Sequence, residues 1–170
     1  MSEPAKKTRR VKLKAGDVFE MPLANGALGY GVAILGGGTP YIIVLRTLHI
    51  ERPHIDVLSS DAIALVGWTM DALVFHGRWS VVFPDYPTRN DVPYPNWKVR
   101  IGGEVHTTDF AGNVLGPATS SEIDLLDNQS SRSPIAFQNA FEALHDLQPW
   151  RSDYDRLTPA YLSARMTRPR

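Results

Sequence analysis

The sequence predicts an α+β fold: a strongly bent, mostly antiparallel β-sheet of the SH3-like or half-barrel type, with two or three C-terminal helices packed against it. Apolar residues recur with the short period of strands over residues 14–115 and with the longer period of helices over residues 119–165. Strands that come first and helices that come last are typical of an α+β domain. With 170 residues and 43% hydrophobic content the chain suits a single domain, which we place at residues 13–165.

The first predicted element is a hairpin over residues 18–35. Residues 18–21 alternate as a half-buried strand does. Asn25-Gly26 favours a type I′ turn, because both residues tolerate a positive φ angle. Tyr30 then opens the second strand. Residues 41–45 form an uninterrupted apolar run after a glycine-rich turn, and we expect a buried central strand there.

The remaining strands are shorter. Residues 61–68 fit either a strand or a short helix. Four prolines over residues 84–96 predict an extended loop that crosses the surface. The other strands are expected at residues 72–76, 79–83, 98–101, 105–110 and 113–115.

Helix signals begin near residue 119. Thr119 and Glu122 form a capping box, which predicts a helix over about residues 120–126. Ser133 and Pro134 suit the N-cap and first position of a helix over residues 134–147. That helix carries one apolar stripe, made by Phe137, Ala140, Phe141 and Leu144. A further helical segment is expected from residue 152, broken or kinked at Pro159.

Charge is unevenly distributed along a chain whose formal net charge is zero. Residues 1–14 carry a net charge of +5, and residues 15–164 carry −8. We expect residues 1–12 to be a disordered basic tail. The acidic body should attract basic partners and disfavour nucleic acid, because phosphate contacts dominate nucleic-acid binding.

The chain has no cysteine, which excludes disulfides, thiolate metal sites and a cysteine nucleophile. It also lacks a run of about 18 apolar residues and an apolar stretch behind the N-terminal charges. We therefore expect a cytoplasmic protein without a membrane partner. Its oligomeric state is open.

Two stretches carry a family resemblance. The pattern from Gly16-Asp17 to Tyr30-Gly31, and the run Ser131-Arg132-Ser133-Pro134 with the helix after it, resemble the bacterial immunity protein 26 family. That family is grouped with small phosphotriesterases of the HocA type. The resemblance implies a protein that binds and neutralises a cognate toxin domain without catalysis. The alternative that it implies is a small hydrolase of organophosphate triesters.

An immunity protein needs a binding surface rather than a catalytic constellation. We expect that surface on the proline-rich loop, since large aromatic side chains beside carboxylates are typical of interface anchors for basic partners. The predicted partner-binding residues are Tyr86, Tyr94, Trp97, Asp85 and Asp91. Arg132 is expected to clamp its loop through Asp124, Asp127 and Asn128, or to contact a partner.

A hydrolase would need a way to activate water, such as a metal held by several histidines and carboxylates. His49, Glu51 and His54 resemble such a ligand cluster, but Pro53 breaks the helix that would present both imidazoles together. We favour a polar loop there.

His76 and His106 could also meet across a sheet beside Asp109 or Glu104, although polar residues on a solvated face explain the same pattern. We expect no cofactor and no catalytic residue. A nucleic-acid-binding SH3-like barrel is a third class, which the acidic body argues against.

Overall fold

The computed structural model describes residues 12–168 and contains two antiparallel sheets. The larger has five strands in the order β4-β3-β2-β1-β5, and the smaller has three in the order β6-β7-β8. This arrangement confirms the α+β class. The strands are β1 (Val18–Pro22), β2 (Leu28–Leu35), β3 (Tyr41–Leu45), β4 (Ile63–Trp68), β5 (Ser80–Phe83), β6 (Trp97–Ile101), β7 (Glu104–Thr108) and β8 (Val114–Pro117).

The helices are short, and most of them follow the strands. The helices are α1 (Ile55–Ser59), α2 (Ala72–Phe75), α3 (Ser120–Leu125), α4 (Pro134–Leu144), the 3₁₀ helix η1 (Ser152–Leu157) and α5 (Pro159–Ser163). Two of them, α1 and α2, interrupt the β-rich half. The predicted basic tail covers residues 1–12, and all of it except Lys12 lies outside the described residues. None of the helices within residues 12–168 combines the length and the apolar character needed to cross a bilayer.

The β1–β2 hairpin forms as expected, with Val18 opposite Val32 and Pro22 opposite Leu28. Its turn differs from the predicted type I′. Gly26 has a φ of 81°, but Asn25 does not have a positive φ. Asn25 instead accepts a hydrogen bond from the Ala27 amide through its side-chain oxygen (3.0 Å), so the loop closes as a longer turn.

Two glycines in β2 let aromatic rings lie directly on the backbone. A Cβ atom at Gly31 would stand 2.3 Å from the Phe19 ring, and one at Gly29 would stand 2.6 Å from the Phe141 ring. Both distances are far shorter than a van der Waals contact. The glycines on either side of Tyr30 are therefore required by packing rather than by the turn.

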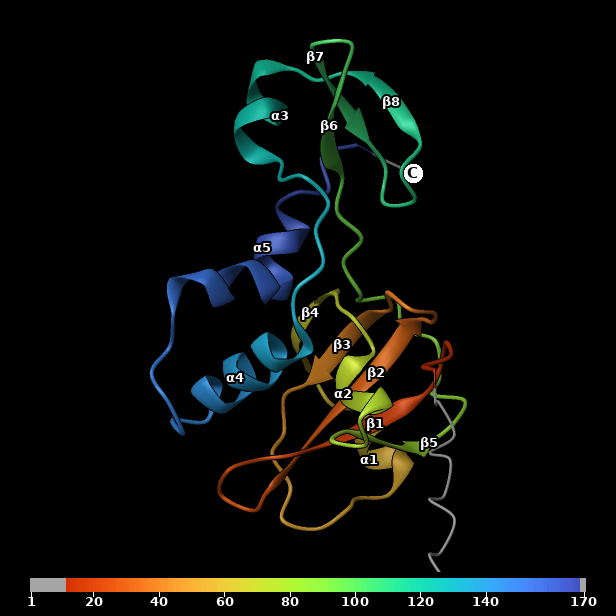
Figure 1. Cartoon of the computed structure of the whole chain (residues 1–170), viewed down its shortest axis with the longest axis vertical. Helices are drawn as coiled ribbons and strands as arrows, with labels where there is room; N and C mark the ends of the chain where they lie inside the picture. The colour runs from red at the N-terminus through yellow and green to blue at the C-terminus, as the bar shows by residue number, and fades with distance from the viewer. Residues whose placement is uncertain (1–11, 169–170) are drawn as a thin grey trace, which may run out of the picture.

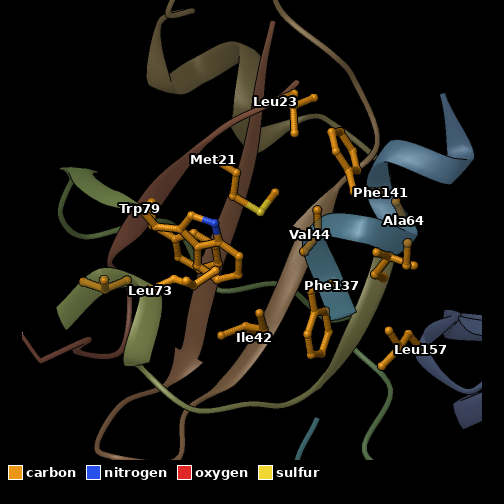
Figure 2. Packing of buried hydrophobic residues seen from close by; sticks show 14 of the residues in the cluster. Met21, Leu23, Ile42, Val44, Ala64, Leu73, Trp79, Phe137, Phe141 and Leu157 are labelled. Atoms are coloured by element: carbon orange, nitrogen blue, oxygen red, sulfur yellow. The ribbon is translucent and has the colours of Figure 1, made fainter. Parts of the chain in front are cut away.

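Helix α4 closes one face of the larger sheet. Phe137, Ala140 and Phe141 are fully buried, which confirms the predicted stripe. Figure 2 shows the rings of Phe137 and Phe141 on either side of Val44, with Leu23 beside Phe141. On the same side Trp79 stacks on Phe19 with ring centroids 4.9 Å apart. The helix starts at Pro134 as expected, although the Ser133 side chain makes no capping hydrogen bond.

The smaller sheet stands apart from the larger one, joined to it by two extended segments, residues 84–96 and 126–133 (Figure 1). The predicted capping box of α3 is confirmed, with Thr119 and Glu122 bonded reciprocally. Helix α5 lies between the two sheets. The Asn96 amide donates to the Arg165 carbonyl (3.0 Å), and the Lys98 amide donates to the Asp127 carbonyl (3.0 Å).

Two expectations about local structure are wrong. Residues 72–75 form a helix instead of a strand, ended by Gly77 at a φ of 68°. Residues 55–59 form a helix that was not predicted, with His54 as its N-cap. Helix α4 ends at Leu144 rather than residue 147. The apolar run at residues 72–75 is too short for its period to separate strand from helix.

Candidate partner-binding surface

The aromatic side chains of the proline-rich loop fold inward. Tyr86 and Trp97 are each only 7% exposed, and the Tyr86 hydroxyl donates to the buried Leu58 carbonyl (2.9 Å). Tyr94 is half-buried between Tyr41 and Phe110, with ring centroids 5.9 and 4.9 Å away. The expectation of exposed rings is therefore wrong for Tyr86 and Trp97. These rings fasten the segment between the two sheets to the core.

The two carboxylates of this loop lie in different environments. Asp85 is exposed and has a φ of 57°. Asp91 accepts a hydrogen bond from Arg89 Nε at 2.7 Å, and this interaction lowers the pKa of the carboxyl. Arg89 also lies 3.2 Å from the Tyr86 hydroxyl. Both carboxylates are exposed, but Asp91 is paired with a cation of its own loop, whereas Asp85 has no ion-pair partner among residues 12–168.

The motif residues at the N-terminal side of the sheet have structural partners. Gly16, at a φ of 87°, donates its amide to the Ala33 carbonyl (2.8 Å), and the Asp17 side chain accepts from the Lys14 amide (2.8 Å). The Tyr30 hydroxyl donates to Glu20 (2.7 Å). These bonds fix the β1–β2 hairpin and its entry.

Glu20 also accepts from Arg52 Nε at 2.9 Å. This hydrogen bond from Arg52, assisted by the one from Tyr30, lowers the pKa of Glu20 despite its partial burial. Burial and the neighbouring carboxylate raise the pKa of Tyr30. The three side chains tie the hairpin to the segment before α1.

Arg132 clamps its segment through the backbone and not through its guanidinium. Its amide donates to the Trp68 carbonyl (2.8 Å), and Thr69 Oγ1 donates to its carbonyl (2.9 Å). Among residues 12–168 the guanidinium makes no hydrogen bond or ion pair. The predicted clamp to Asp124 and Asp127 is therefore wrong.

Asp127 has other partners. Its Oδ2 accepts from the Tyr161 hydroxyl (2.7 Å) and from Arg165 Nε (3.2 Å). Arg165 also lies over the Tyr161 ring, 3.3 Å from its centroid. The loop is thus held by α5 and the residues after it, which the sequence did not indicate.

The three residues of the weak metal hypothesis are not brought together. The His49 ring packs edge-on against Tyr30 at 5.5 Å, His54 caps α1, and Glu51 is exposed. In the described part of the chain no group of three or more histidine, cysteine, aspartate or glutamate side chains is placed to hold a metal ion.

An open apolar face on the smaller sheet was missed at the sequence level. Val99, Ile101 and Val114 are 38%, 45% and 53% exposed. Cross-strand pairing puts Trp97 opposite Thr108 and Val99 opposite His106, so alternate residues of β6 share this face. The hollow on it has a volume of about 350 Å³ and is lined by Trp97, Lys98, Val99, Arg100, Ile101, Thr108, Gly112, Val114, Asn128 and Gln129.

The opposite face of the same sheet is covered. Lys98 points to that side and its Nζ donates to the Ile123 carbonyl of α3 (2.6 Å). Its cross-strand neighbour Thr107 is fully buried. The alternation of apolar and basic residues at 97–101 indicates a two-faced strand, but which face α3 covers depends on the tertiary fold.

Comparisons of the chain with protein-family models, with curated proteins and with solved structures found no match.

Proposed function

We propose that this protein is a non-catalytic immunity-like protein that binds and neutralises a cognate toxin domain in the bacterial cytoplasm. The open face of Val99, Ile101 and Val114 carries the proposal. Exposed apolar side chains gathered on one face and rimmed by polar ones mark protein-binding sites. The sheet that carries them projects from the larger sheet, so a partner can reach it without displacing the core (Figure 1).

The charge of the chain favours a basic partner. Residues 15–164 carry a net charge of −8, and a partner with a basic active-site cleft would be drawn to such a body. Some cations of the chain are already paired with its own carboxylates, as Arg52 is with Glu20 and Arg165 with Asp127. Asp85, in the segment that leads to the smaller sheet, and Asp124, in α3, are exposed carboxylates.

The larger sheet fits the SH3-like form that we propose for it. Strand β5 returns to pair with β1, so that a simple meander closes toward its own beginning. The register shifts within the β1–β5, β2–β3 and β3–β4 pairs. Such irregularities increase the local twist and bend a sheet, as a half-barrel requires.

The test is a binding assay with the product of the neighbouring gene, which we expect to be the toxin. The double variant Ile101→Glu, Val114→Glu places two charges on the open face, and both positions are exposed, so the fold should persist. We expect at least ~100-fold weaker binding and loss of protection in cells that express the toxin. Ile50→Glu is the matched control, because Ile50 is 79% exposed but lies outside this face.

Two results would contradict the proposal. Unchanged toxin affinity in the double variant would move the interface away from this face. Hydrolysis of an organophosphate triester by the purified protein, abolished by a chelator and restored by metal, would favour the hydrolase alternative instead.

A further inference from the structure

A second hollow lies where the larger sheet, the smaller sheet and the C-terminal helices meet. It is a cleft of about 330 Å³. Val66, Leu157 and Leu162 supply apolar lining, and they are buried. The complete lining is Val66, Gly67, Trp68, Trp97, Lys98, Asp127, Asn128, Ser130, Arg132, Arg156, Leu157, Tyr161 and Leu162.

The charges that line this cleft are unbalanced. Lys98, Arg132 and Arg156 are cationic, and Asp127 is the one carboxylate among the lining residues. Asp127 already accepts hydrogen bonds from Tyr161 and from Arg165, and Arg165 does not line the cleft. The cleft is therefore cationic, although residues 15–164 carry a net charge of −8.

The cations in the cleft are available to a ligand. Lys98 Nζ donates only to a neutral acceptor, the Ile123 carbonyl, among the described residues. The guanidinium groups of Arg132 and Arg156 make no hydrogen bond or ion pair within residues 12–168. A hydrogen bond from Arg151 is the main cause of the lowered pKa of Asp153, and the charge of Arg132 makes a minor contribution. Asp153 forms its ion pair with Arg151, at 2.9 Å, and not with Arg132. Two fork-shaped donors are left without an acceptor.

Two further donors in the wall of the cleft lack acceptors. The indole Nε1 atoms of Trp68 and Trp97 are buried, and neither has a hydrogen-bond partner in the described part of the chain. A buried N–H without an acceptor is destabilising, and structures usually provide one. The donor groups of four lining residues, Trp68, Trp97, Arg132 and Arg156, thus lack an acceptor among the described residues.

We propose that this cleft binds a small organic oxyanion, a carboxylate or a phosphate monoester that carries an apolar or aromatic body. The oxyanion lies against Arg132 and Arg156, because guanidinium forks match such groups bidentately. The apolar body lies against Leu157, Leu162 and Trp68. A volume of 330 Å³ is at the small end of ligand pockets and suits a single-ring ligand rather than a dinucleotide.

The apolar side chains of the proposed toxin surface do not line the cleft. None of Val99, Ile101 and Val114 is among its lining residues, although the two hollows share Trp97, Lys98 and Asn128. Oxyanion binding can therefore fail while toxin binding persists, and the reverse also holds.

The experiment is calorimetric titration of the full-length protein with phenyl phosphate and with benzoate. We expect saturable binding of at least one of them, and the stronger arm identifies the oxyanion. Benzyl alcohol has the aromatic ring without the negative charge, and inorganic phosphate has the charge without the ring. Each should bind at least ~10-fold more weakly than the better of the two aromatic anions. Raising the salt concentration should weaken oxyanion binding.

Variants locate the binding site. Arg132→Gln and Arg156→Gln should each weaken oxyanion binding ~10- to 100-fold, as expected for the loss of a charged hydrogen-bonding partner. Arg78→Gln is the matched control, since Arg78 is exposed and does not line the cleft. Because Arg156 is exposed, Arg156→Gln should fold normally even if Arg132→Gln does not.

The inference is overturned by any of three results. The first is no saturable binding of either aromatic anion at concentrations up to ~10 mM, a range that includes very weak ligands. The second is equal binding of benzyl alcohol or of inorganic phosphate. The third is unchanged affinity in folded Arg156→Gln protein.

Discussion

Glu122 and Arg168 form a bidentate ion pair across 46 positions of the chain. Arg168 Nε donates to Oε1 and Nη2 donates to Oε2, each at 2.6 Å. Glu122 is 6% exposed and also closes the capping box of α3 by accepting from the Thr119 amide at 2.8 Å. One carboxylate thus caps a helix and holds the end of the described chain against the smaller sheet.

The pair predicts a loss of stability in acid. Arg168 lowers the pKa of Glu122 to about 2, from an ordinary value of 4.5. The pKa of Glu122 is lower in the folded state than in the unfolded state. The ion pair's contribution to the free energy of unfolding is therefore fully present above pH 4.5 and is lost as the pH falls toward 2. In Glu122→Gln this dependence should disappear, and unfolding at pH 7 should need about 1.5–3 kcal/mol less. Urea denaturation between pH 7 and pH 2 measures both effects.

The control for this prediction is Asp153→Asn, which removes a pair with Arg151 whose side chains are 68% and 46% exposed. Solvent screens such a pair, so its loss should change stability much less. Equal pH dependence of the wild type and Glu122→Gln below pH 4.5 would show that this pair does not contribute.

Elements that carry their own local signal could be predicted from the sequence. Strand β3 is an uninterrupted apolar run, α3 has a capping box, and α4 has Pro134 and an apolar stripe. The Glu122–Arg168 pair could not be predicted, because nothing local to either residue specifies a partner so far away. Helix α2 was mistaken for a strand because four apolar residues do not define a period.

Trp97 should be important for stability rather than only for binding. It is 7% exposed at the start of β6, where the extended segment enters the smaller sheet. Trp97→Ala should lower the free energy of unfolding by about 3–5 kcal/mol, because it removes a large buried ring. Thermal and urea denaturation measure the loss. Asn90→Ala, at an exposed position of the same segment, is the control, and its free energy of unfolding should stay within about 0.5 kcal/mol of the wild type. A loss in Asn90→Ala as large as that in Trp97→Ala would contradict the structural role of the Trp97 ring.

Two of the expected partner-binding residues, Tyr86 and Trp97, are buried for a physical reason. Tyrosine, tryptophan and proline make a segment suitable both for binding a partner and for packing inward. The Tyr86 hydroxyl donates a hydrogen bond to the Leu58 carbonyl, and the Tyr94 ring packs against Tyr41 and Phe110. These partners lie far from the loop in the sequence, so no local pattern indicates them. The alternation at residues 97–101 indicates that Val99 and Ile101 share one side of a strand. It does not indicate that this side is exposed, because the exposure depends on which side α3 covers.

Helix α4 should depend on its buried phenylalanines. Phe141 is fully buried against β2, where its ring occupies the space that a side chain at Gly29 would need. Phe141→Ala should reduce the free energy of unfolding by about 3–5 kcal/mol. Leu147→Ala, beyond the end of α4 and 37% exposed, should cost less than about 1 kcal/mol. Guanidinium denaturation of both variants measures these changes. If Phe141→Ala lowers the free energy of unfolding by less than about 1 kcal/mol, the ring is not packed as described.

The final prediction concerns the glycines of the Gly-Tyr-Gly motif. An alanine Cβ at Gly31 would lie 2.3 Å from the Phe19 ring and 2.9 Å from the Ile43 carbonyl. Phe19 cannot yield easily, since it stacks on buried Trp79 with an angle of 5° between the rings, and the backbone of β3 cannot yield without breaking its pairing. Gly31→Ala should therefore destabilise the protein by at least about 2 kcal/mol, through overpacking.

The matched control is Gly38→Ala, in the glycine-rich turn before β3. No atom lies within 4 Å of a Cβ built there, and its φ is not in the left-handed region. Restricting the unfolded chain at such a position is expected to stabilise by up to about 1 kcal/mol. Urea denaturation should therefore move the two variants in opposite directions. If Gly31→Ala is as stable as the wild type, the ring of Phe19 does not rest on the β2 backbone, and the glycines of the motif are retained for another reason.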